Sequence, residues 1–102
     1  MQELKLSKAI NINGEKTNSI QYDLDNLTGE SIENAVKEMA KIGYVSTVQE
    51  VDSILHAHIF AEASGLDYQD MKRLGAKDYI KATGIIRNFF LEDVEDSHQD
   101  NI

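Results

Sequence analysis

Histidines and carboxylates are the residues of this chain whose types could bind a metal ion. His56 and His58 are two positions apart, which on a helix turns their side chains about 200° from one another and prevents a shared metal face. The pairs Asp52–His56 and His58–Glu62 have the four-residue spacing of a common helix face, so each could supply two ligands. A metal site needs three or four ligands, and the chain offers no cysteine and only His98 beyond these. We therefore predict no metal centre.

A serine in the tripeptide Asp52-Ser53-Ile54 is the second candidate for chemistry. It lacks the Gly-x-Ser-x-Gly turn that exposes the nucleophile of many hydrolases, so we predict no catalytic residue. On an acidic, helical chain of this size the tripeptide resembles the Asp-Ser-Leu attachment site of acyl carrier proteins, where the serine begins a helix and carries phosphopantetheine. Here Thr47 and Glu50 form a capping-box pattern that is expected to start the helix earlier and to bury Ser53 in its second turn. We expect no cofactor, and an acyl-carrier-like protein that uses Ser53 remains the alternative.

The charge balance bears on possible partners. The chain has 10 basic and 18 acidic residues, a net charge of −8, and its basic residues are scattered along the sequence. Because nucleic-acid binding draws its affinity from clustered Lys and Arg, we predict no nucleic-acid partner. No stretch approaches the roughly 18 apolar residues of a membrane span, and the chain lacks cysteine. We therefore expect an intracellular protein without a membrane partner.

The elements that would position such residues begin with a β-hairpin over 4–24. Apolar residues fall at even positions on both sides of Asn13-Gly14, namely Leu4, Leu6, Ile10, Ile12, Ile20, Tyr22 and Leu24. A two-residue turn would place even positions opposite odd ones, whereas a three-residue loop keeps both apolar sets on one face. We therefore predict a three-residue loop, with Gly14 in the left-handed region of a G1 bulge.

Helical patterns follow the hairpin, punctuated by glycine in a chain without proline. Apolar spacing and end signals predict helices over about 29–42, 47–64, 67–74 and 77–91. Thr28 and Asp67 are expected to cap the first and third helices, and Gly43 and Gly65 to end the first and second. The fold class is α+β, a hairpin packed on a small bundle of three to four α-helices, forming one domain over 1–91. Residues 92–102 are acidic and are predicted to be a disordered tail.

The last predicted helix carries more apolar residues than one buried stripe needs. We propose four of them as candidate partner-binding residues: Ile80, Ile85, Phe89 and Phe90. The competing interpretation places them in the core, with Ile80 and Ile85 covering the hairpin and Phe90 facing the first two helices.

Short motifs in a particular order resemble the tail assembly chaperones of long-tailed bacteriophages. The resemblance covers nearly the whole chain before the acidic tail. The residues that carry it are Leu6-Ser7-Lys8-Ala9-Ile10, Asn13-Gly14-Glu15, Ile20, Tyr22, Ala63-Ser64-Gly65-Leu66, Leu74, Asp78-Tyr79 and Phe89-Phe90.

This resemblance implies a non-enzymatic role in the cytoplasm of the host bacterium. Such proteins coat the long, hydrophobic tape measure protein, keep it soluble and help recruit tail tube subunits, without remaining in the mature virion. Members of the family also tend to self-associate, so a homo-oligomer is expected. The alternatives are the acyl-carrier-like protein above and a generic small oligomeric protein-interaction module.

Overall fold

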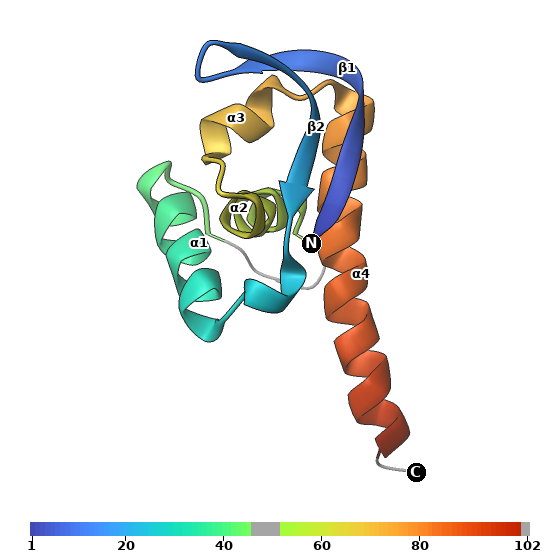
Figure 1. Cartoon of the computed structure of the whole chain (residues 1–102). Coiled ribbons are helices and arrows are strands. Elements are labelled where there is room, and N and C mark those ends of the chain that lie inside the picture. The colour runs from blue at the N-terminus through green and yellow to red at the C-terminus, as the bar shows by residue number, and fades with distance from the viewer. Residues whose placement is uncertain (46–51, 101–102) are drawn as a thin grey trace.

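The computed structural model describes residues 1–45 and 52–100, the last eight of them by their backbone alone. A two-stranded antiparallel hairpin precedes four α-helices, which confirms the α+β class (Figure 1). The elements in chain order are β1 (Gln2–Ile12), β2 (Glu15–Tyr22), the short 3-10 helix η1 (Leu24–Asn26), α1 (Gly29–Lys41), α2 (Ser53–Ser64), α3 (Tyr68–Arg73) and α4 (Ala76–Asp100).

Helix α2 lies at the centre of the molecule, between α1 on one side and α4 on the other (Figure 1). It also contacts α3 and β2. Every residue from Leu55 to Ala61 is buried, because each face of the helix meets a different neighbour. A helix that is apolar on all sides belongs in the interior, and α2 forms the centre of the core.

The turn of the hairpin differs from the prediction. Ile12 pairs with Glu15, so the loop has two residues, not three. Asn13 and Gly14 both have positive φ, 53° and 84°, as a type I′ turn requires. The left-handed conformation of Gly14 is confirmed, whereas the G1 bulge at this turn is wrong. Asn-Gly is the preferred sequence for the two-residue turn, and that local preference prevails here.

The shared apolar face of the hairpin is confirmed. Leu4 pairs directly with Ile20, and Leu4, Ile10, Ile20 and Tyr22 are buried against the helices. A register shift inside β1 makes this possible, because residues 6–9 lie opposite Asn18 alone. The two-residue turn alone would place the even-numbered residues of the two strands on opposite faces. Because β1 has an odd number of extra residues at the shift, the even-numbered apolar residues beyond it return to the same face as those of β2.

One carboxylate explains where the register shifts. Asp78, at the start of α4, is fully buried and accepts hydrogen bonds from the Ser7 backbone N–H (2.9 and 3.0 Å to its two oxygens), the Ser7 hydroxyl (3.0 Å) and the Lys8 N–H (3.2 Å). The Ser7 N–H bond is the main reason that the pKa of Asp78 lies below its usual value. The irregular part of β1 is therefore fastened to α4.

Most predicted helix ends are confirmed. Thr28 caps α1 and Asp67 caps α3, each in a reciprocal capping box. Gly43 and Gly65 have φ of 82° and 74°. The α1 end is a complete Schellman motif, with Gly43 N–H bonded to Ala40 O (2.9 Å) and Tyr44 N–H to Met39 O (3.2 Å); Leu66 N–H makes the corresponding bond to Ala61 O (3.0 Å) after α2.

The start of α2 differs from the predicted range of 47–64. The helix begins at Ser53, and the Asp52 carboxylate accepts from the Ile54 N–H (2.9 Å) and the Leu55 N–H (3.1 Å). An ionised N-cap at the positive end of the helix dipole is favourable, so Asp52 is a competent start signal. The predicted capping box at Thr47–Glu50 lies outside the described residues.

The end of α4 also differs from the prediction. The helix was expected to stop at Leu91 before a disordered tail over 92–102, but it runs to Asp100. Neither glycine nor proline follows Gly84. Extending an existing helix needs no new nucleus, so residues that would be disordered alone can continue it. Residues 101–102 lie outside the described residues.

Candidate functional site

The four predicted partner-binding residues do not form one exposed patch. Ile80 is 67% exposed, whereas Ile85 and Phe90 pack against the buried core and Phe89 is half-buried. The Phe90 ring stacks on His56 of α2, with centroids 5.5 Å apart, and meets the Phe89 ring edge-on at 6.2 Å. Among the four, Ile80 is therefore the residue most available to a partner. The expectation that Ile80 covers the hairpin is wrong, because its side chain points to solvent.

Helix α4 presents a solvent-facing surface that is both apolar and basic. We call it the α4 outer face; it consists of Lys77, Ile80, Lys81, Gly84, Arg87, Asn88 and Leu91. All of these are exposed except Gly84, which is half-buried. A Cβ atom added at Gly84 would have no other atom within 4 Å beyond the adjacent residues and backbone of its own helix. The three basic residues are notable in a chain whose net charge is −8. This face suits an apolar partner with negative charge near it.

A second exposed apolar cluster lies where α1 ends, and the sequence reasoning did not assign it to binding. Ile42 is 53%, Tyr44 38% and Val45 78% exposed. One signal in the sequence could have indicated this cluster. Apolar residues stand on both sides of Gly43, and their spacing is not the helical spacing that would place them on one buried face. The Tyr44 hydroxyl donates to Asp52, which raises the pKa of this tyrosine and connects the end of α1 to the start of α2.

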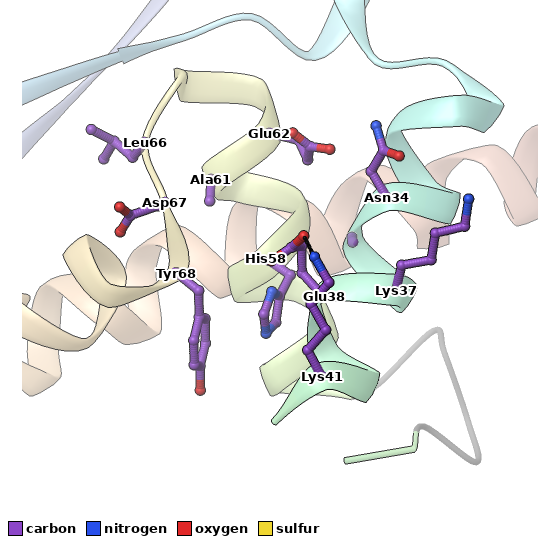
Figure 2. Close-up of a pocket in the computed structure, with 11 residues that line it drawn as sticks. Asn34, Lys37, Glu38, Lys41, His58, Ala61, Glu62, Leu66, Asp67 and Tyr68 are labelled. Atoms are coloured by element: carbon purple, nitrogen blue, oxygen red, sulfur yellow. Dashed lines mark hydrogen bonds and ion pairs between the residues drawn. The ribbon is translucent and has the colours of Figure 1, made fainter. Parts of the chain in front are cut away.

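A pocket of about 480 Å³ lies between α1 and α2 (Figure 2). Its lining residues are Asn34, Ala35, Lys37, Glu38, Lys41, His58, Ala61, Glu62, Leu66, Asp67 and Tyr68. Lys41 Nζ and Glu38 Oε1 form an ion pair of 2.8 Å at its wall. Carboxylates and ammonium groups are mixed around this pocket, so its charge does not select one class of small ligand.

His58 is the most unusual group in this pocket. The residue is 4% exposed, its ring stacks on Tyr68 with centroids 3.9 Å apart, and its Nε2 has no hydrogen-bond partner. Burial lowers the pKa of His58 below its ordinary value, and the nearby Glu38 opposes that shift in part. The neutral imidazole therefore predominates at pH 7, packed as an aromatic ring.

We predict that this histidine makes stability depend on pH. Because its pKa is lower in the folded than in the unfolded chain, the unfolded chain binds the proton first as the pH falls below about 6.5, and the free energy of unfolding decreases from there. The urea midpoint should therefore drop between pH 7 and pH 5.5 by more in the wild type than in His58→Gln. Equal slopes for the two proteins would contradict the assignment to His58.

The two central histidines face different elements, His56 towards Phe90 of α4 and His58 towards Tyr68 of α3. Within residues 1–45 and 52–100, no group of three or more His, Asp or Glu side chains is arranged to hold a metal ion. None of the helices in that part of the chain is long and apolar enough to cross a membrane.

Ser53 lies elsewhere than expected. It is the first residue of α2 and is exposed, so the prediction that a helix starting at Thr47 buries it is wrong. The position at a helix N-terminus is the one that the acyl-carrier resemblance calls for. The rest of α2 is unlike an exposed recognition helix, because Leu55 to Ala61 are buried.

Comparison with known proteins adds no relative to this description. A scan against family models, a search of curated proteins and a search of solved structures each give no match to the chain.

Proposed function

We propose that this chain is a phage or prophage tail assembly chaperone that binds the tape measure protein and keeps it soluble. In this role it also helps recruit tail tube subunits, acts in the cytoplasm of the host bacterium and is absent from the mature virion. The motif order between Leu6 and Phe90 supports the family. No enzymatic step is part of the proposal.

The observation that carries the proposal is the exposure of large apolar side chains on an otherwise acidic protein. Ile80 on α4 and Val45 after α1 are 67% and 78% exposed, and Ile42 lies beside the latter in sequence at 53%. Isolated exposed apolar residues are common, but three of them, Ile42, Tyr44 and Val45, follow one another closely after the end of α1, and such a group is typical of protein-binding sites. The net charge of −8 would keep a complex with a hydrophobic client dispersed.

Co-expression with the tape measure protein encoded in the same genome tests the proposal. We expect the client to be soluble in the presence of this protein and to aggregate without it. Because apolar contacts are screened little by salt, the complex should survive about 0.5 M NaCl. A client that is equally soluble with and without the chain would refute the chaperone role.

Matched variants show which surface is used. Ile80→Asn removes the apolar group without adding charge and should release the client, whereas Asn11→Asp, at an exposed hairpin position, should have no effect. Ile85→Asp is unsuitable for this purpose, because Ile85 packs against the core and its loss would damage the fold. Circular dichroism of each variant separates lost binding from lost structure.

The acyl-carrier-like alternative has one observation in its favour, the exposure of Ser53 at the start of α2. Incubation with coenzyme A and a phosphopantetheinyl transferase, followed by intact-mass measurement, tests it directly. A mass increase that is lost in Ser53→Ala would support this alternative over the chaperone. The third candidate, a generic oligomeric interaction module, predicts self-association without any effect on the client.

A further inference from the structure

A hollow of about 520 Å³ between the hairpin and α3 is lined by basic side chains from three elements. The turn of the hairpin lies over α3 in Figure 1, and this overhang brings residues of β1, β2 and α3 together. We call the site the basic hollow; its lining residues are Lys8, Ala9, Ile10, Asn11, Lys16 and Arg73. None of them is acidic, although the chain has a net charge of −8. Basic residues that are scattered in the sequence therefore meet here in the fold.

The two lysines of the basic hollow are available to a partner. Lys8 and Lys16 are both exposed, and within residues 1–45 and 52–92 neither forms an ion pair. Their backbones are nevertheless held in place. The Lys8 N–H bonds to Asp78 (3.2 Å), and Lys16 pairs with Asn11 across the hairpin. The hollow therefore presents two unneutralised ammonium groups on a fixed scaffold.

Arg73 adds a positioned guanidinium group. One of its nitrogens donates to Asp70 Oδ1 (2.6 Å), and the other oxygen of that buried carboxylate accepts from the Asp67 N–H (3.3 Å). The Arg73 side chain is still 55% exposed. Because a guanidinium group carries five N–H donors in one plane, the bond to Asp70 fixes its position and leaves donors for a carboxylate of another molecule.

We propose that the basic hollow binds an acidic peptide segment of a partner protein, whose carboxylates pair with Lys8, Lys16 and Arg73. Charge complementarity supports this occupant, because the cations come from separate elements and each can take a carboxylate of its own. A nucleic acid fits less well, since no lining residue is an aromatic on which a base could stack and a net charge of −8 repels a long polyanion. Backbone N–H groups at a helix N-terminus, which commonly hold a phosphate, do not line the hollow, because Arg73 ends α3.

This inference does not rest on the proposed function, and salt separates the two. The apolar groups at Ile80 and Val45 are expected to hold a client at high salt, whereas pairing between exposed charges is screened. The basic hollow can therefore fail its test while the chaperone role holds, and the reverse is equally measurable.

Fluorescence polarisation with a labelled peptide of alternating glutamate and glycine tests the proposal at pH 7. We expect the wild-type protein to bind this peptide and not the same peptide with glutamine in place of glutamate. The affinity should fall about tenfold between roughly 20 and 200 mM NaCl. The double variant Lys8→Gln/Lys16→Gln should bind about tenfold more weakly than the wild type, because two exposed charge pairs are lost.

Lys37→Gln/Lys41→Gln is the matched control, since it makes the same change of net charge at exposed positions of α1 that do not line the hollow. This variant should bind the glutamate peptide as the wild type does, and circular dichroism should show all three proteins equally folded. Equal weakening in the two double variants would indicate a non-specific effect of net charge and overturn the proposal. Equal binding of the glutamine peptide would do so as well, and so would tighter binding of a single-stranded oligonucleotide of the same charge.

Discussion

Phe60→Ala is expected to reduce the free energy of unfolding by about 3–5 kcal/mol. Phe60 is fully buried in α2, and its ring lies 5.1 Å from that of Tyr22, so it joins the central helix to the hairpin. Removing the ring loses its transfer free energy and leaves a cavity that the surrounding helices can fill only in part. A domain of this size has about 5–15 kcal/mol of stability in total, so the variant would be partly unfolded at 37 °C.

Urea titration followed by circular dichroism measures this loss. Phe60→Leu is the matched control, because it keeps most of the apolar volume and should lose much less. If Phe60→Ala lost under about 1 kcal/mol, the hairpin would not depend on α2 as the structure indicates.

Asp78→Asn is expected to lower the midpoint of thermal unfolding by roughly 10 °C. The carboxylate accepts from two successive backbone N–H groups and a hydroxyl of β1, and an amide cannot accept at both positions. Ser7→Ala removes the hydroxyl donor alone and should have a smaller effect. Equal effects of the two variants, or no effect of Asp78→Asn, would contradict the role of this carboxylate as the fastening of β1.

The pH dependence of the same group has a definite sign. The pKa of Asp78 is lower in the folded chain than in the unfolded one, so its contribution is complete above the ordinary aspartate pKa. The contribution is lost as the pH falls through the lowered value. The difference in thermal midpoint between wild type and Asp78→Asn should therefore shrink on acidification from pH 5 and disappear at the lowest pH.

The sequence by itself determined the local features of this protein. Thr28 and Asp67 were predictable as helix caps, and Gly43 and Gly65 as helix ends, because a cap or a left-handed residue depends only on the atoms of a few neighbours. The α+β class and the single apolar face of the hairpin also followed from period and parity, since these patterns are properties of one element.

Only the tertiary structure decided where the pairing of the hairpin becomes irregular, because the group responsible, Asp78, is about 70 residues away from Ser7 and Lys8. The spacing of apolar residues could not predict the exposure of Ile80 either. A period shows that an apolar residue could face a neighbour, but α2, the hairpin and α4 together determine which side of α4 is covered. Local signals depend on short-range bonds, whereas the register shift and the exposed face arise from contacts that exist only once distant segments have packed together.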